Sequence, residues 1–273
     1  MFHKSIFVFC ALIASATSAL SQDFYLKTFG DSSQPALLFL HGGPGYNSAT
    51  FEATTAKPLA EAGFFVLVYD RRGEGRSQAL EAAYTFEESI RDINLIYTKY
   101  HLEKATLLGH SFGGMLAVKY AEVHPEKAKS LVLIGAPMAL QASFKHIIKS
   151  AKAIYKAKAD SINLRYIGML EAMDTTTIAY SSYCFSHAMQ NGFYNPKELS
   201  AQAQELYKKI GDDAALAKAA NTMGYKAPQG FWTNESYTTL DLRPNLKALK
   251  ANGLAIYGLY GQEDGLYSEA QIN

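Results

Sequence analysis

Short, continuous apolar runs alternate along this chain with longer stretches that have helical periodicity. The runs lie at about residues 35–40, 64–69, 105–110 and 130–135, and strand character returns at 253–260. Such runs are typical of strands buried on both faces, because helices cover both sides of a parallel sheet. The pattern therefore predicts an α/β fold, with a mostly parallel sheet and helices on both faces.

The composition changes after about Ala139. From there to about Thr239 the chain is rich in Ala, Lys and Tyr, has helical periodicity and contains no clear strand run. We interpret residues 139–239 as a helical cap inserted into an α/β core, which residues 22–138 and 240–273 form. A cap over an active site excludes water and limits what can enter.

The first residues have the features of a secretory signal peptide. Positive charge in Met1–Lys4 precedes a mostly apolar stretch, and Ala19-Leu20-Ser21 offers small residues before Gln22. We expect cleavage after residue 21 and export to the periplasm or the exterior. The apolar stretch is too short for a permanent span, although an N-terminal membrane anchor is the alternative.

Composition excludes several other classes. The 26 basic and 25 acidic residues leave no charge excess typical of nucleic-acid binding. No metal-ligand spacing occurs, His146 and His187 stand alone in predicted helices, and we expect no cofactor. After signal cleavage Cys184 is the only cysteine, which excludes an internal disulfide, and we interpret it as a buried structural thiol. The oligomeric state is left open.

The sequence G-H-S-F-G at 109–113 directly follows an apolar run. It predicts a strand that turns sharply into a helix, with Ser111 at the apex. Glycines two residues to either side let the strand and the helix approach closely, which holds the serine in a strained conformation with its hydroxyl exposed. Ser111 is therefore a candidate nucleophile.

A second glycine cluster, H-G-G-P-G at 41–45, follows the strand predicted at 35–40. Backbone N–H groups of such a loop can bind an anion. We expect the N–H groups of Gly43 and Phe112 to hold the oxyanion of a tetrahedral intermediate; an ordinary Gly/Pro turn is the alternative. A third cluster, D-R-R-G-E-G-R-S at 70–77, is dense in charge, and we expect Asp70 and its arginines to pair and brace the loops.

These three motifs resemble the α/β-hydrolase superfamily, and specifically its proline iminopeptidase-like branch of serine peptidases. The resemblance implies that Ser111 is the nucleophile and Asp264 the triad acid, with Glu263 as the alternative in the same loop. In that branch cap carboxylates bind the substrate's ammonium group. Glu171 and Glu235 are the nearest candidates here, and Trp232 is a further candidate substrate-binding residue.

The resemblance also implies the chain order Ser, Asp, His, and no histidine follows Asp264. We interpret His41 and His110 as structural. We therefore expect that the chain stops short of a last strand, a last helix and the triad histidine; a pseudoenzyme that naturally has no histidine is the alternative. The chain as given is expected to be inactive, because a triad without its base loses several orders of magnitude in rate.

The favoured function is an exported serine hydrolase that, when complete, releases N-terminal proline or another residue from short peptides by acyl-enzyme chemistry. One alternative is an esterase or small-molecule amide hydrolase, because these enzymes share the same catalytic core and only the cap determines which substrate is accepted. Another is a non-catalytic binding protein on the same fold.

Overall fold

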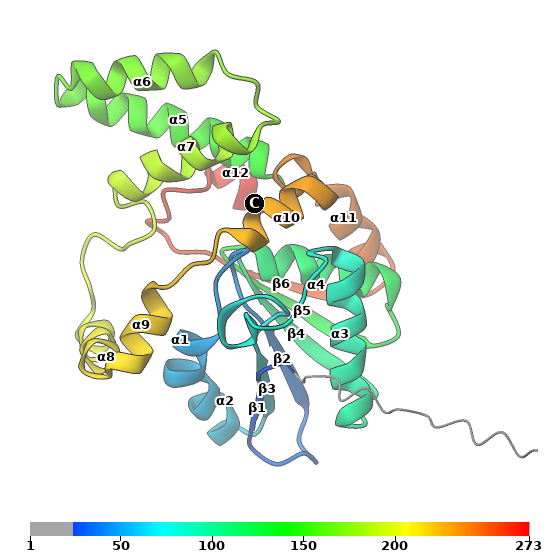
Figure 1. Ribbon diagram of the computed structural model, residues 1–273. Helices are drawn as coiled ribbons and strands as arrows, with labels where there is room; N and C mark the ends of the chain where they lie inside the picture. The colour runs from blue at the N-terminus through cyan, green and yellow to red at the C-terminus, as the bar shows by residue number, and fades with distance from the viewer. Residues whose placement is uncertain (1–23, 273) are drawn as a thin grey trace, which may run out of the picture.

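A six-stranded sheet forms the centre of the protein, for which the computed structural model describes residues 24–272 (Figure 1). The strands lie in the order β1-β3-β2-β4-β5-β6. Only β1 is antiparallel to its neighbour. This confirms the predicted fold class; the signal peptide predicted at 1–21 lies outside the described residues. The strands are β1 (Leu26–Phe29), β2 (Ala36–Leu40), β3 (Phe65–Tyr69), β4 (Ala105–His110), β5 (Ala128–Ile134) and β6 (Ala255–Leu259).

Burial explains why the sequence pattern predicted these strands. Every residue of β2 and β3 is buried. Alternate side chains enter two apolar clusters on opposite faces, with Leu38 and Leu40 in one and Leu37 and Phe39 in the other. The strand that the sequence analysis missed is β1, a four-residue edge strand without a buried residue.

The two faces of the sheet are covered by different helices. On one face lie α3 (Phe86–Lys99), α4 (Phe112–Val123) and α11 (Arg243–Ala251), and on the other a continuous helical segment from Ala49 to Glu61 (Figure 1). This segment consists of α1 (Ala49–Phe51), a π-helical stretch (Glu52–Ala56) and α2 (Lys57–Glu61). The Thr85 side chain caps α3 by accepting from Glu88 N.

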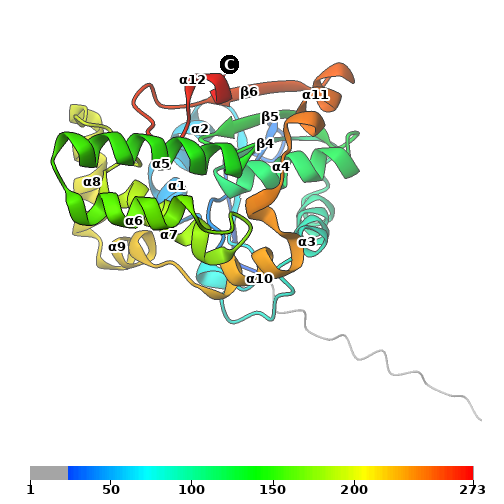
Figure 2. The same ribbon diagram turned by 90° about the horizontal axis from the view of Figure 1, so that it is seen from above.

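Helices also fill the chain between β5 and α11, over the region predicted as a cap. The first three pack together and lie above the carboxyl ends of the strands (Figures 1 and 2). The next two contain no buried residue. The helices are α5 (Leu140–Ala157), α6 (Ser161–Glu171), α7 (Ile178–Gln190), α8 (Ala201–Asp212), α9 (Ala214–Asn221), α10 (Lys226–Glu235) and a 3₁₀ turn at Tyr237–Thr239.

Beyond this region the chain forms the edge strand β6, where Tyr257 and Leu259 stay more than half exposed. A short helix, α12 (Glu269–Ile272), follows. None of the helices formed by residues 24–272 is long and apolar enough to cross a bilayer.

Candidate active site

The strand order reverses between β2 and β4. The chain proceeds outward from β2 to β3 on one side and from β4 to β5 on the other. In open α/β sheets, ligands bind at the carboxyl ends of the strands at such a reversal. The loop after β2 begins at His41, and Ser111 directly follows β4, so both motifs lie at this point of the sheet.

Ser111 forms a sharp bend between β4 and α4. Its backbone has φ 50° and ψ −122°, a conformation that a non-glycine residue rarely adopts. A Cβ on Gly109 would lie 2.5 Å from the Cα of Gly114, and one on Gly113 would lie 2.0 Å from the carbonyl oxygen of Leu40. Only glycine fits at these two positions, as the sequence pattern indicated. The bend projects Ser111 into a cavity that it lines together with Gly43 and Phe112.

The loop after β2 lies directly against this serine. A Cβ on Gly42 would be 3.3 Å from the Cβ of Ser111 and 2.9 Å from Nδ1 of His110. The Phe112 N–H opens α4 and has no acceptor within the helix. The Gly43 N–H likewise donates to no group among residues 24–272. Two backbone donors and a hydroxyl thus border one cavity, which is the arrangement that oxyanion stabilisation requires.

Arg71 fixes the loop after β2 from behind. Its guanidinium donates to the carbonyl oxygens of His41 and Gly42, and its Nε donates to Glu74 at 2.8 Å. Its backbone N–H donates to Nε2 of His41 at 3.0 Å. Because the carbonyl groups are held on the Arg71 side, the Gly43 N–H is free to face the cavity.

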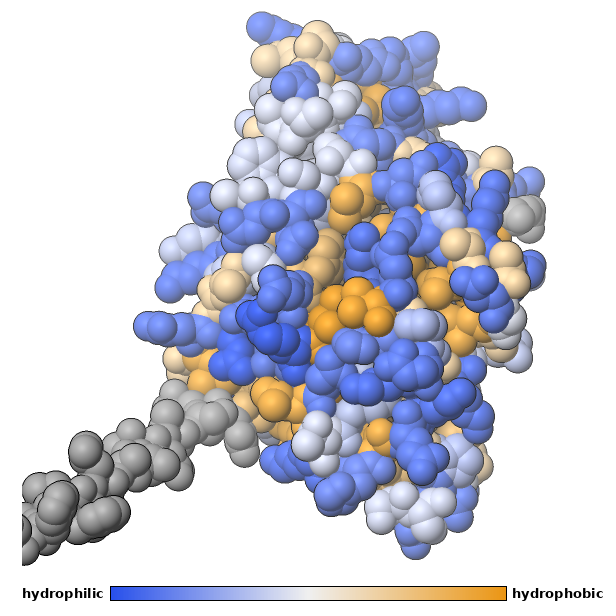
Figure 3. All heavy atoms as spheres, turned by 90° about the vertical axis from the view of Figure 1, so that its right-hand side faces the viewer, coloured by the Kyte–Doolittle hydropathy of each residue, from blue (hydrophilic) through white to orange (hydrophobic). Residues whose placement is uncertain are grey.

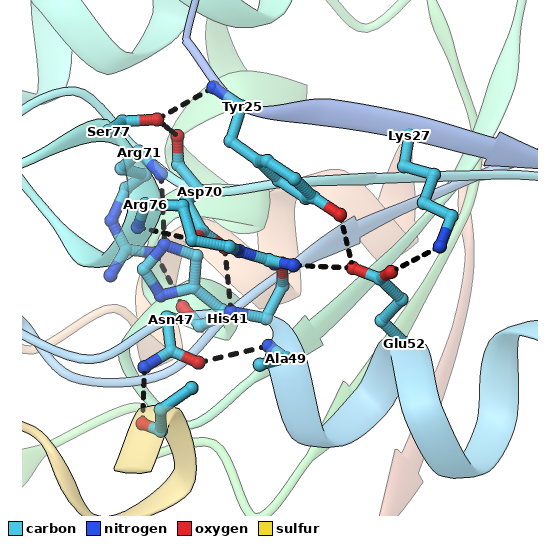
Figure 4. Close-up of polar contacts among 12 residues, drawn as sticks. Tyr25, Lys27, His41, Asn47, Ala49, Glu52, Asp70, Arg71, Arg76 and Ser77 are labelled. Carbon is cyan, nitrogen blue, oxygen red and sulfur yellow. Dashed lines mark hydrogen bonds and ion pairs between the residues drawn. The ribbon is translucent and has the colours of Figure 1, made fainter. Parts of the chain in front are cut away.

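Asp70 is the centre of a second network in the same region (Figure 4). Its buried carboxylate accepts from Ser48 and from the Arg76 guanidinium at 2.7 Å, and Arg76 continues to Glu52. Burial is the largest single influence and would raise the pKa of Asp70, but the hydrogen bonds from Arg76 and Ser48 and the nearby positive charge together outweigh it, and the pKa is held at about 2. The predicted pairing of Asp70 with an arginine is confirmed.

Glu74 is a residue of this region that the sequence analysis did not single out. Its carboxylate is fully buried, pairs with Arg71 and accepts a hydrogen bond from the backbone N–H of Gly45. It therefore holds the far end of the loop that Arg71 holds at its start. The sequence shows Glu74 as an acid between two glycines in a charge-dense turn. Its hydrogen-bond partner, Gly45, lies 29 residues away in sequence, so the pattern alone does not reveal the contact.

The cavity in front of Ser111 is small and uncharged. It has a volume of about 40 Å³, which is less than a drug-sized ligand needs. Its lining is mostly apolar and aromatic, with the hydroxyl groups of serine and tyrosine as the polar exceptions. The lining includes Met115, Leu140, Ile147, Phe185, Tyr194, Tyr237 and Tyr267. We therefore expect the helices above the sheet to move when a substrate of that size binds.

Asp264 lies in the loop after β6. Its Oδ1 accepts from Leu266 N at 2.9 Å, and its Oδ2 would be 4.0 Å from a Cβ on Gly135, the residue after β5. Burial raises its pKa above the ordinary value, while the Leu266 hydrogen bond and the nearby His146 oppose this. Glu263 instead pairs with Lys197 and is more exposed. This difference favours Asp264 over Glu263 as the acid.

Four of the described histidines, His41, His124, His146 and His187, interact with groups other than Ser111. His41 is buried between a backbone donor and a backbone acceptor, and burial, helped by the charge of Arg71, lowers its pKa well below the ordinary value. His187 contacts the Tyr155 hydroxyl through Nδ1 at 2.9 Å, and His124 contacts Asn94. His146 interacts electrostatically with Asp264, although it does not line the cavity.

The three candidate substrate-binding residues lie away from the cavity lining. Glu171 pairs with Lys152 at 2.6 Å on the surface. Glu235 accepts from Phe86 N at 2.7 Å, and the Trp232 indole donates to the carbonyl oxygen of Thr176. The predicted ammonium binding by Glu171 and Glu235, and the predicted substrate contact of Trp232, would require a rearrangement of these helices.

Cys184 is fully buried in α7, and burial raises the pKa of its thiol to about 12. This confirms the interpretation as a structural thiol, because a nucleophilic cysteine needs a thiolate. Among residues 24–272, no group of three or more His, Cys, Asp or Glu side chains could hold a metal ion.

Comparison with known proteins agrees with the predicted α/β-hydrolase fold. A family model described as alpha/beta hydrolase fold matches residues 35–178. The chain is 36% identical to a proline iminopeptidase of Lactobacillus delbrueckii subsp. bulgaricus over 115 residues. The aligned region covers 40% of this chain and 39% of that protein. Over 113 residues the chain is 34% identical to a putative carbamate hydrolase of Variovorax paradoxus, or 41% of this chain and 42% of the relative. The matched region thus spans well under half the length of these relatives.

A solved structure covers more of the chain. A proline iminopeptidase-related protein of Thermus thermophilus superposes with a TM-score of 0.62, over 91% of this chain and 80% of that one. The sequence identity is 23%, so this likeness concerns the fold alone.

Proposed function

Because the chain belongs to the α/β-hydrolase fold family, we propose that it is a serine hydrolase with Ser111 as its nucleophile. The Ser111 oxygen attacks the carbonyl carbon of an amide or ester, while the N–H groups of Gly43 and Phe112 stabilise the oxyanion. Collapse of this intermediate expels the amine or alcohol and leaves an acyl-enzyme, which water hydrolyses. The strained backbone of Ser111, at the border of a cavity that Gly43 and Phe112 share, carries this proposal.

Asp264 is proposed as the acid that orients the catalytic imidazole. The attack requires a base for the Ser111 proton, and His41, His124 and His187 are hydrogen-bonded to other groups. We propose that an imidazole must reach Ser111 to take up this proton. An imidazole supplied in solution is a direct substitute for it.

Labelling with a fluorophosphonate tests Ser111. We expect slow phosphonylation at Ser111, acceleration by added imidazole, and none in Ser111→Ala, with the modified peptide identified by mass spectrometry. A matched control is Ser143→Ala, since Ser143 lines the same cavity without a strained backbone. Absence of labelling even with imidazole, or labelling that persists in Ser111→Ala, would overturn the proposal.

Within this class we propose an aminopeptidase that releases N-terminal proline or a similar residue. The support is the similarity to proline iminopeptidases at 36% identity over part of the chain. A cation-binding carboxylate must then approach the cavity. Glu171 and Glu235 remain the candidates, and each would have to leave its present partner, Lys152 or Phe86.

An ester or small-molecule amide hydrolase is the second candidate. The absence of charged side chains from the lining of the Ser111 cavity favours it, because an apolar acyl group needs no counter-charge. Prolyl and alanyl amides, their N-acetylated forms and short acyl esters should be compared in the presence of imidazole. A loss of rate on N-acetylation supports the aminopeptidase, and equal rates support the second candidate.

We also propose that the protein is exported. The basic start and apolar stretch before Gln22 are its support. Fractionation of cells that express the gene, with N-terminal sequencing of the product, tests this; intact residues 1–21 on a cytoplasmic product would contradict it.

A further inference from the structure

Positive charge is concentrated in one part of a nearly neutral protein. The whole chain has a formal net charge of +1. Residues 140–171, which form α5 and α6 and are named here the cap hairpin, contain six basic residues and only two acidic ones, Asp160 and Glu171. The rest of the molecule is therefore net acidic, and the positive charge of the hairpin is a local feature.

Four of these basic residues form a row along α5. Lys145, Lys149, Lys152 and Lys156 follow the spacing i, i+4, i+7 and i+11, which places them on one side of a helix. Lys152 pairs with Glu171. The other three are exposed and form no ion pair with any residue from 24 to 272. Three cations thus stand unneutralised along one helix.

The second helix of the hairpin carries an apolar row on its outside. Ile162, Tyr166 and Met169 are 68%, 54% and 59% exposed, and their spacing of i, i+4 and i+7 places them on one face of α6. Ile167 and Leu170 on another face are buried in the main core. A solvated helix usually keeps one apolar face, so the second face of α6 is unexplained by folding.

The hairpin lies at the outer end of the molecule. In Figure 1, α6 is the element farthest from the lower ends of β1–β3, and Figure 2, which looks down on this end, shows α5 and α6 side by side in the foreground. The same end, at the top of Figure 3, mixes hydrophilic and moderately apolar residues. Both rows are therefore accessible to a large, flat partner.

We propose that the cap hairpin docks on the surface of an anionic lipid bilayer. The lysines of α5 meet the lipid phosphate groups, and Ile162, Tyr166 and Met169 enter the headgroup region, where tyrosine and aliphatic side chains are favoured. The lysine row supplies charge complementarity to such a surface. Nucleic acid would use the lysines but leave the apolar row in water, so the combination favours lipid. This inference is independent of the catalytic proposal.

Hydrogen exchange of the full chain with phosphatidylglycerol-containing vesicles, or with phosphatidylcholine vesicles alone, tests the docking. Because the exchange is read peptide by peptide, protection of 140–171 is distinguished from binding through the N-terminal apolar stretch. We expect protection of the hairpin with the anionic vesicles only, and its weakening by salt.

Two matched triple variants test whether the lysine row of the hairpin causes the binding to anionic vesicles. Replacing Lys145, Lys149 and Lys156 with Gln should lower the partition onto anionic vesicles on the order of 100-fold, because each lysine near the surface contributes roughly fivefold. Replacing Lys129, Lys247 and Lys250, three exposed lysines outside the hairpin, removes the same charge and should leave hairpin protection intact.

Three results would overturn the docking proposal: no hairpin protection with either vesicle, equal protection in both triple variants, or concentration-dependent protection without vesicles. The last result would identify a second copy of the chain as the occupant. Replacing Ile162 and Met169 with Ser should weaken protection on anionic vesicles while leaving the salt dependence; no change would remove the apolar row from the interface.

Discussion

The buried carboxylate of Glu74 accepts a hydrogen bond from the backbone N–H of Gly45, the last residue of the H-G-G-P-G loop. The same carboxylate neutralises Arg71, which holds the first carbonyl groups of that loop. The loop beside Ser111 is thus fixed at both ends by one buried ion pair, which leaves the Gly43 N–H free to face the cavity.

The substitution Glu74→Gln should destabilise the protein by about 3–5 kcal/mol, because it leaves the Arg71 charge buried without a partner. Urea unfolding followed by circular dichroism measures this. The control is Glu87→Gln, which breaks the exposed pair with Arg91 and should cost no more than about 1 kcal/mol. Similar losses in the two variants would show that burial of the pair is unimportant.

Replacement of Ser111 should reveal the backbone strain at the bend between β4 and α4. Ser111→Gly should be more stable than Ser111→Ala by about 1 kcal/mol or more, because glycine adopts a positive φ without cost and alanine does not. At the exposed helical position Ala153 the order should reverse, with Ala153→Gly costing about 1 kcal/mol. Equal stability of the two Ser111 variants would remove the argument for strain at the bend.

Acid stability should depend on Asp70. Its pKa is about 2 in the folded protein and 3.8 in its ordinary state, so the folded state favours the ionised carboxylate. The resulting stabilisation, about 2 kcal/mol, is complete above pH 3.8 and is lost as the pH falls through 2. In Asp70→Asn this part of the acid dependence should be absent, as measured by chemical unfolding at several pH values. In Glu81→Gln, at an exposed position, the wild-type dependence should persist.

Cys184 should be unreactive in the folded protein. Burial and a pKa of about 12 leave almost no thiolate at neutral pH. In a Cys10→Ser background, a chromogenic disulfide reagent should react with Cys184 only as fast as the protein unfolds, and immediately in denaturant. Rapid reaction under native conditions would mean that α7 opens locally.

The contact of Tyr46 with the cap should control the mobility of α9. The Tyr46 hydroxyl donates to the carbonyl oxygen of Ala220 at 2.7 Å, near the end of a helix without buried residues. Tyr46→Phe should speed amide exchange in 214–221 several-fold while changing global stability by no more than about 1 kcal/mol. Tyr207→Phe, which alters an exposed tyrosine of α8, should leave this exchange unchanged.

The sequence predicted those elements whose structure depends on residues close together in the chain. Fully buried strands such as β2 read as continuous apolar runs, and Gly109 and Gly113 mark the bend because no other residue fits there. The edge strand β1 lacked such a run. Glu74 and Glu235 could not be assigned from sequence, because their partners, Gly45 and Phe86, are brought near only by the fold.

Three hydrogen bonds join the cap to residues 45–47, at the end of the H-G-G-P-G loop and just beyond it. Gly224 N donates to Gly45 O at 2.7 Å, and the side chains of Tyr46 and Asn47 donate to Ala220 O and Ala219 O. A cap that moves away to admit a substrate must break these three hydrogen bonds, while Arg71 and Glu74 continue to hold the loop. The buried ion pair, and not the cap, therefore keeps the Gly43 N–H in place while a substrate enters.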